Sequence, residues 1–77
     1  MSRNLKKKKL IEFFINFIRH DYGFYNPIWK WNSLPKQIKD NYDLLQDKLQ
    51  EWEEKGHVKV FMIDGEIMIE IFSVPEN

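Results

Sequence analysis

The chain has 77 residues, of which 43% are hydrophobic and 16% aromatic, and its 12 basic and 12 acidic residues give a formal net charge of zero. This length leaves room for a single domain (residues 1–77), and the lack of cysteine excludes disulfides and zinc–thiolate sites. Free-standing nucleic-acid-binding proteins are usually clearly basic, so the balanced charge argues against that role.

A basic N-terminal lead-in, residues 1–9, precedes the first expected helix at about 8–21. We expect the lead-in to be solvated, with a phosphate-contacting patch as the alternative. The apolar residues of the helix cover roughly twice the ~100° arc that a surface helix buries. The helix should therefore be covered on several sides or meet a partner, with a homodimer through this helix as one option.

The apolar run within this first helix does not indicate targeting or membrane insertion. Glu12, Asn16 and Arg19 interrupt it, and no cleavage-site pattern follows. No segment reaches the length of a membrane-spanning helix. We therefore expect a cytoplasmic protein that does not associate with a membrane.

Turn-forming residues divide the middle of the chain into short elements. Gly23, Asn26 and Pro27 indicate a loop. Residues 28–31 (IWKW) are a candidate for a short third strand at a sheet edge. Ser33 is a candidate N-cap for a second helix at 33–40. A third helix is predicted at 42–55, capped by Asn41 and ended by Gly56.

The predicted third helix is strongly amphipathic. Its apolar side comprises Tyr42, Leu44, Leu45, Leu49 and Trp52. Its polar side comprises Asp43, Gln46, Asp47, Gln50, Glu51 and Glu54. Such a helix buries the first side in a core and presents the second to solvent or to a partner.

A β-hairpin at 57–63 and 66–73 follows, because Asp64-Gly65 between two apolar runs favours a two-residue type I′ turn. A two-residue turn fixes the register of the strands. One face then holds only apolar pairs: Met62 with Ile67, Val60 with Ile69, and Val58 with Ile71. The other face holds Ile63 with Glu66, Phe61 with Met68, Lys59 with Glu70, and His57 with Phe72.

The order of these elements, together with the end of the third helix, resembles the winged helix-turn-helix superfamily, an α+β fold. The residues that carry the resemblance are Leu45, Leu49, Trp52, Glu53, Glu54, Lys55, Gly56, His57 and Val58. They are similar to the "L…L..LE.KG.I" pattern of bacterial winged-helix regulators, with tryptophan in the place of a leucine. The resemblance covers about residues 8–73 and implies three helices followed by a two-stranded wing.

The resemblance also implies a DNA-reading surface, but its charge does not suit DNA. In that superfamily the third helix usually enters the major groove, and the wing touches the DNA backbone or the minor groove. Gln46 and Gln50 suit this role, because a glutamine amide can bind adenine in bidentate fashion. The carboxylates on the same side would be repelled by phosphates, and the wing tip, 64–66, has no basic residue.

Positive charge is concentrated outside the third helix. The possible nucleic-acid contacts are Lys6, Lys7, Lys8, Lys9, Lys30, Lys36, Lys39, Gln46 and Gln50. Trp29 and Trp31 flank Lys30, a pattern that could bind single strands through stacking. In so small a chain, however, the favoured interpretation is that both tryptophans are core or sheet-edge residues.

The sequence contains no pattern typical of catalysis or metal binding. Its serines have no glycine-rich elbow, its three glycines are isolated, and His20 and His57 lack metal-ligand spacing. We therefore expect no enzyme activity, no cofactor and no metal.

The leading functional hypothesis is a winged-helix accessory protein that binds a larger protein acting on nucleic acid in replication, transcription or a mobile element. Its expected protein-partner face comprises Asp43, Asp47, Glu51, Glu54, Phe61 and Met68. The alternative is a stand-alone DNA-binding transcriptional regulator. A second alternative is a phage-type inhibitor that mimics nucleic acid, although such mimics are usually strongly acidic.

Overall fold

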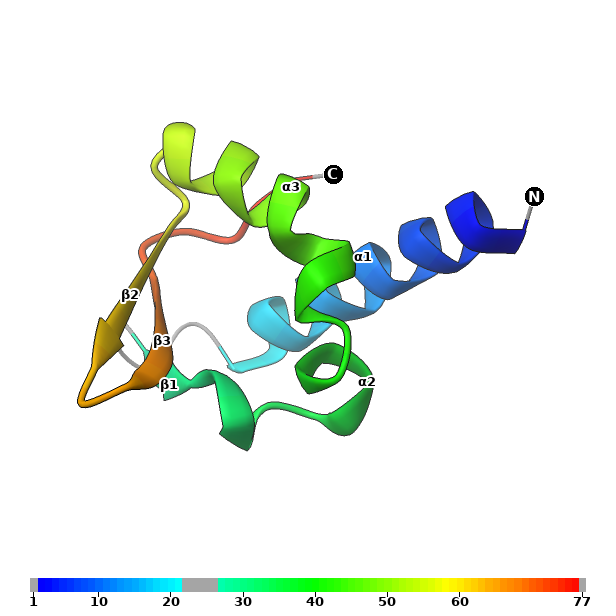
Figure 1. Cartoon of the computed structure of the whole chain (residues 1–77). Helices are drawn as coiled ribbons and strands as arrows, with labels where there is room; N and C mark the ends of the chain where they lie inside the picture. Colours follow the sequence, from blue (N-terminus) through cyan, green and yellow to red (C-terminus); the bar gives the residue numbers. More distant parts are fainter. Residues whose placement is uncertain (1, 22–26, 77) are drawn as a thin grey trace.

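The structure is a computed structural model that describes residues 2–21 and 27–76, with side chains from Lys6 onward in the first helix. Helix α1 spans Ser2–Asp21 and is followed by strand β1, Ile28–Lys30, and the 3-10 turn η1, Trp31–Ser33. Helices α2, Lys36–Lys39, and α3, Tyr42–Glu54, come next. Strands β2, Val58–Ile63, and β3, Glu66–Ile71, complete the chain (Figure 1). The loop prediction on Gly23 and Asn26 lies outside the described residues.

The three strands form one antiparallel sheet in the order β1-β3-β2. The hairpin has the predicted register, from Ile63 opposite Glu66 to Val58 opposite Ile71. Asp64 and Gly65 have φ values of 52° and 80°, both positive, as a type I′ turn requires. The optional third strand is confirmed as β1, which pairs with β3. This arrangement fits a small winged helix with α+β architecture.

Helix α1 begins at Ser2, about two turns before the predicted start, so the lysine run is helical and not an irregular lead-in. Lysine is a good helix former, and residues 2–21 contain neither glycine nor proline. The run therefore projects from the body of the protein as a continuation of the helix (Figure 1).

The predicted second helix is shorter than expected and is preceded by η1. Ser33 does not cap it, because the Ser33 hydroxyl donates to the Lys30 carbonyl at 2.7 Å. Pro35 is the N-cap residue of α2 instead. Asn41 is at the predicted N-cap position of α3, but its side chain donates back to the Gln37 carbonyl at 2.7 Å. This bond ties the start of α3 to α2.

Gly56 ends α3 in the predicted way. Its φ of 82° is in the left-handed region, where glycine carries no Cβ penalty. The His57 N–H donates to the Trp52 carbonyl at 2.9 Å, and the Gly56 N–H donates to the Glu53 carbonyl at 3.1 Å. These two bonds form a Schellman motif, which turns the chain directly into β2.

The core is built around aromatic rings from three elements. Phe14 of α1 lies with its ring centroid 5.8 Å from that of Trp31 and 5.6 Å from that of Trp52. Trp31 is buried and donates its indole N–H to the Lys39 carbonyl at 3.0 Å. Trp29 is partly buried, with its ring 5.2 Å from that of Phe17. Both tryptophans beside Lys30 are therefore packing residues, as the favoured interpretation held.

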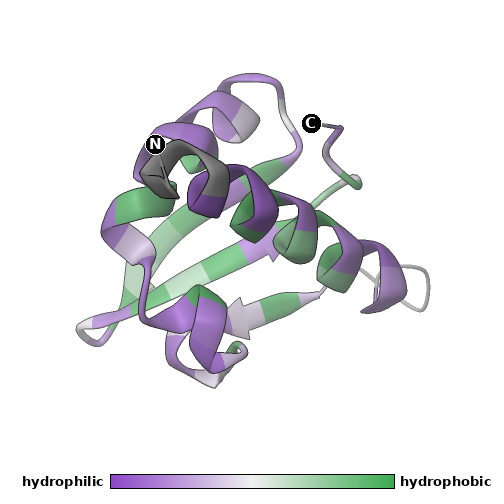
Figure 2. Ribbon diagram, turned by 90° about the vertical axis from the view of Figure 1, so that its right-hand side faces the viewer, coloured by the Kyte–Doolittle hydropathy of each residue, from purple (hydrophilic) through white to green (hydrophobic). Residues whose placement is uncertain are grey.

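All the helices lie on one side of the sheet, as the two ribbon views show (Figures 1 and 2). The inner face buries Val58, Ile69 and Ile71 beneath them. Met62 belongs to the same face by register but is 63% exposed, because the hairpin tip extends beyond the helices. No helix or strand in the described part of the chain covers the opposite face.

Candidate interaction surfaces

The polar side of α3 presents carboxylates and amides to solvent. The helix carries five acidic residues and one basic residue, a net charge of −4. Asp43, Gln46, Asp47, Gln50 and Glu54 are exposed. The predicted phase of α3 is therefore confirmed, with Leu45, Leu49 and Trp52 buried on its other side.

Glu51 is the member of this acidic side that is most engaged with neighbouring lysines. Its carboxylate accepts hydrogen bonds from the Lys55 ammonium at 3.1 Å and the Lys48 ammonium at 3.2 Å. These bonds, first from Lys55 and then from Lys48, lower the pKa of Glu51 below its ordinary value. Glu51 is thus less available to a partner than Asp43 or Glu54.

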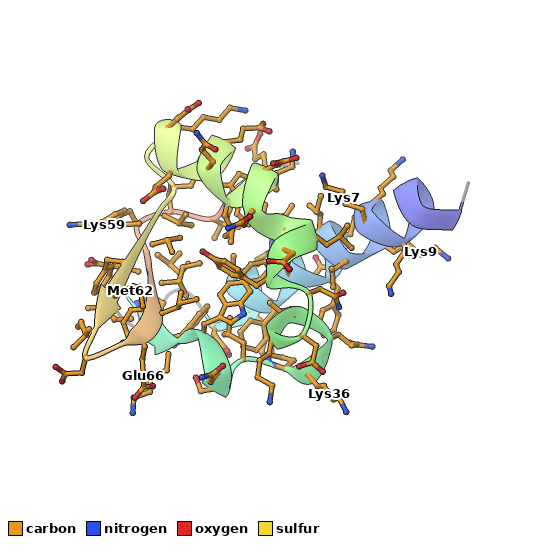
Figure 3. All side chains as sticks on the ribbon, in the orientation of Figure 1. Lys7, Lys9, Lys36, Lys59, Met62 and Glu66 are labelled. Atoms are coloured by element: carbon orange, nitrogen blue, oxygen red, sulfur yellow. The ribbon has the colours of Figure 1, made fainter. Side chains whose placement is uncertain are left out.

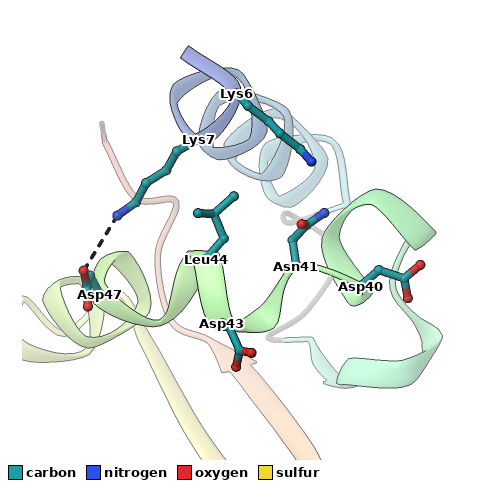
Figure 4. A pocket seen from close by; sticks show the side chains of 7 residues that line it. All are labelled: Lys6, Lys7, Asp40, Asn41, Asp43, Leu44 and Asp47. Carbon is teal, nitrogen blue, oxygen red and sulfur yellow. Dashed lines mark ion pairs between the residues drawn. The ribbon is translucent and has the colours of Figure 1, made fainter. Parts of the chain in front are cut away.

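A groove of about 530 Å³ separates the N-terminal half of α1 from the start of α3. Lys7 reaches across it to Asp47, with 3.7 Å between ammonium nitrogen and carboxylate oxygen (Figure 4). The Asp43 carboxylate also lines the groove but points away from α1. Besides the buried contact between Phe14 and Trp52, the basic and acidic helices are joined by this single ion pair in the described structure.

A second groove, of about 480 Å³, runs between α3 and β2. Gln46 and Gln50, the predicted base-reading residues, line it together with Glu53. The Glu53 carboxylate accepts a hydrogen bond from the Val60 N–H at 3.1 Å. Val60 lies on the edge strand, so Glu53 occupies a backbone donor that a foreign strand would otherwise use.

The uncovered face of the sheet is termed here the outer face. It contains Ile28, Lys30, Lys59, Phe61, Ile63, Glu66, Met68 and Glu70. The predicted partner residues Phe61 and Met68 are half-buried, whereas Ile28 and Ile63 are 52% and 50% exposed. The sequence reasoning missed Ile28, although its alternation with the buried-side Trp29 and the outward Lys30 was visible in IWKW.

Charged side chains surround the apolar ones on the outer face. The Lys59 ammonium lies 5.7 Å from the centre of the Phe61 ring, within cation–π range. Lys30 pairs with Glu66 at 3.9 Å. The outer face is thus a mixed surface, on which apolar side chains lie among charged ones, two of which form an ion pair.

The other predicted lysines lie away from the hairpin. Lys6, Lys8, Lys9 and Lys36 are exposed, and Lys7 and Lys39 are half-buried. Lys9 is on α1 and Lys36 on α2, Lys7 points from α1 toward α3, and Lys59 and Glu66 belong to the hairpin (Figure 3). The structure therefore separates the N-terminal lysines from the hairpin, and Lys30 does not join them.

Residues 2–21 and 27–76 contain neither a metal-binding cluster nor a membrane-spanning helix. No group of three or more His, Asp or Glu side chains there could hold a metal ion. None of the helices in those ranges combines the length and apolarity needed to cross a membrane.

Comparison of the chain with models of protein families, with curated proteins and with solved structures gave no match. The winged-helix architecture is assigned from the element order, strand order and hairpin register of the chain itself.

Proposed function

We propose that this protein is a winged-helix accessory protein, an adaptor that binds a larger protein involved in replication, transcription or the movement of a mobile element. One observation carries the proposal: α3 directs exposed carboxylates outward, where a reading helix would meet DNA. Phosphates repel such a surface, whereas a basic protein surface complements it. Asp43 and Glu54 have no ion pair in the described structure and are free to serve this role.

The outer face supports the same proposal as a second contact region. Exposed apolar side chains that cluster on one surface often mark protein interaction sites. Ile28, Phe61, Ile63 and Met68 provide such side chains on one side of the sheet. The charged side chains around them would form the polar rim that protein interfaces usually have.

Charge reversal on α3 tests the adaptor. Asp43→Lys with Glu54→Lys changes two exposed positions three turns apart on the same side of the helix, and it leaves the Lys7–Asp47 pair intact. Affinity capture from cells of the native host, after nuclease treatment, should recover a partner with the unmodified protein and lose it with the variant.

The matched control is Glu12→Lys with Glu76→Lys, which makes the same change in net charge around a different groove. This control should retain the partner. Loss of every partner on nuclease treatment, or equal capture by both double variants, would contradict the adaptor.

A stand-alone DNA-binding regulator is the second candidate, and the position of two glutamines favours it. Gln46 and Gln50 are exposed and line the groove between α3 and β2. On this alternative, Gln50→Ala should cost about 1–3 kcal/mol of binding free energy on a cognate site. The adaptor instead predicts weak binding of random duplex at physiological salt. Tight, sequence-specific duplex binding that is lost on Gln46→Ala or Gln50→Ala would decide for the regulator.

A further inference from the structure

A small groove between α1 and α2 combines positive charge with an apolar floor. It has a volume of about 230 Å³. Its lining residues are Lys6, Lys9, Leu10, Phe13, Gln37 and Asn41. This α1–α2 groove is separate from the acidic side of α3 and from the outer face, on which the proposed adaptor function rests.

The positive charge at the groove is not neutralised. No carboxylate is among its lining residues, and Lys6 and Lys9 form no ion pair in the part of the chain that the structure describes. Lys6 also borders the larger groove beside α3, which Asp40, Asp43 and Asp47 line (Figure 4). Of these carboxylates, Asp47 pairs with Lys7, and none forms an ion pair with Lys6 in the described structure. Lys36 is a further exposed lysine on α2 (Figure 3), but it does not line this groove.

Phe13 supplies an exposed aromatic ring in the α1–α2 groove. Lys6, Lys9 and Phe13 follow helical spacing, so they form one stripe along α1. Phe14 and Phe17 of this helix have their rings against tryptophans. Phe13 is 39% exposed and has no aromatic neighbour among the described residues. An aromatic ring beside unpaired lysines is the combination that binds bases and phosphates of an unpaired strand.

We propose that the α1–α2 groove binds single-stranded nucleic acid. A base stacks on the Phe13 ring, Lys6 and Lys9 hold the flanking phosphates, and the amide side chains of Gln37 and Asn41 face the base edge. In a duplex the bases are already stacked within the helix and cannot reach Phe13. An adaptor with this groove would hold a strand while α3 and the outer face bind the protein partner.

The test measures fluorescence anisotropy of labelled oligothymidylate and oligouridylate of about 12 nucleotides, a length typical of single-strand sites. The full chain should bind at least one of them more tightly than a duplex of the same length. Phe13→Leu, which keeps an apolar side chain but removes the ring, should weaken binding at least about fivefold. Phe13→Tyr, which keeps a ring, should change it by less than about twofold.

A second pair of variants tests the phosphate contacts through salt dependence. Lys6→Gln with Lys9→Gln should reduce the slope of log K against log salt by about 1.4, because each contact to a single strand contributes about 0.7. Lys55→Gln with Lys59→Gln removes the same charge from the α3–hairpin side and should leave the slope unchanged.

Three results would overturn the inference: wild-type affinity in Phe13→Leu, duplex binding as tight as single-strand binding, or equal loss in the two lysine variants. Competition by poly-glutamate as effective as that by unlabelled oligonucleotide would assign the groove to an acidic protein segment instead. All these measurements use the isolated protein and oligonucleotides. Failure of the single-strand proposal is therefore distinguishable from failure of the adaptor proposal, because the adaptor is tested by capture of a protein partner after nuclease treatment.

Discussion

Helices α1 and α3 carry net charges of equal size and opposite sign, but they use that charge differently. Helix α1 has six basic and two acidic residues, a net charge of +4, against −4 for α3. Three of the five carboxylates of α3 have partners within the protein: Asp47 with Lys7, Glu51 with Lys48 and Lys55, and Glu53 with the Val60 N–H. Of the four consecutive lysines of α1, only Lys7 has an ion-pair partner in the described structure.

Most carboxylates of α3 thus support the fold, whereas most lysines of the α1 run remain available to a ligand. Helix α3 is held by its buried side, by the Schellman turn and by the Glu53 bond to the edge strand. Helix α1 is held by Leu10, Ile11, Phe14, Ile15 and Ile18, and its lysine-rich half projects beyond the body (Figure 1). We therefore expect changes in α3 to affect stability more than equivalent changes in the first half of α1.

The largest effect is expected at Trp52, which joins α3 to α1 through Phe14. Trp52→Ala should lower the free energy of unfolding by about 3–5 kcal/mol, a large part of the roughly 5–15 kcal/mol typical of a domain. The change should appear as extensive unfolding in circular dichroism and in denaturant titration.

Two variants serve as comparisons for Trp52→Ala. Trp52→Phe should cost less, because it keeps a ring and removes an indole N–H that lacks a hydrogen-bond partner in the described structure. Phe13→Ala, at the exposed edge of α1, should cost less still. A near-normal melting temperature for Trp52→Ala would show that α3 does not anchor the core.

A smaller effect is expected from Glu53, which connects α3 to the edge of the sheet. Glu53→Ala leaves the Val60 N–H without its acceptor and should lower the free energy of unfolding by about 1 kcal/mol. Because an unprotected edge strand can pair with another chain, this variant should also self-associate in sedimentation at high concentration.

Glu54→Ala is the matched control, since Glu54 is the next residue on α3, is exposed and forms no bond to β2 in the described structure. It should self-associate no more than the unmodified protein at the same concentration and change stability by less than about 0.5 kcal/mol. Equal behaviour of the two variants would mean that Glu53 does not protect the edge.

The sequence predicted those parts of the fold that depend on local patterns. Asp64-Gly65 determined both the turn and the pairing of every residue in the hairpin, because a two-residue turn permits a single register. The end of α3 was likewise predicted from Gly56. Its phase was predicted from the spacing of Leu45, Leu49 and Trp52. These signals are short-range, and tertiary contacts reinforced them.

Some local features, such as the cap of the second helix, were predicted wrongly, because Ser33 bonds to Lys30 instead. Other features that the sequence did not predict depend on contacts between distant elements. The Lys7–Asp47 pair and the Glu53–Val60 bond join residues whose proximity follows only from the packing of the helices. Met62 follows the apolar pattern of the inner face, yet it is exposed, because the pattern does not indicate where the helices above the sheet end. The position of Phe13 beside α2 could not be derived from helical periodicity for the same reason.

The Lys7–Asp47 pair, the ion pair between the two helices, should contribute little. Asp47 is 91% exposed, and exposed pairs typically contribute about 0.2–1 kcal/mol. A double-mutant cycle with Lys7→Gln and Asp47→Asn should give a coupling energy in that range at low salt, and it should be lost near 1 M salt. The control cycle pairs Lys7→Gln with Asp43→Asn and should give none, because the Asp43 carboxylate points away from α1. A larger, salt-resistant coupling would mean that α1 is fixed by charge as well as by its apolar side.

The smallest expected effect is the pH dependence of folding stability that Glu51 of α3 causes. Hydrogen bonds from Lys55 and Lys48 lower the pKa of Glu51 in the folded protein below the ordinary value of 4.5. Folding therefore favours the ionised form, so this contribution to stability is fully present above the ordinary pKa. It is lost as the pH falls through the lowered pKa of the folded state.

Glu51→Gln removes the ionisable group and should lower the melting temperature slightly near neutral pH. The gap between this variant and the unmodified protein should narrow as the pH falls below about 4.5, because the protonated Glu51 then resembles glutamine in charge. A gap that stays constant from about pH 3 to 7 would mean that Lys48 and Lys55 stabilise α3 by contacts other than charge. The charge of Glu51 would then be no better neutralised within the protein than that of Asp43. Both carboxylates would be equally available to a basic partner.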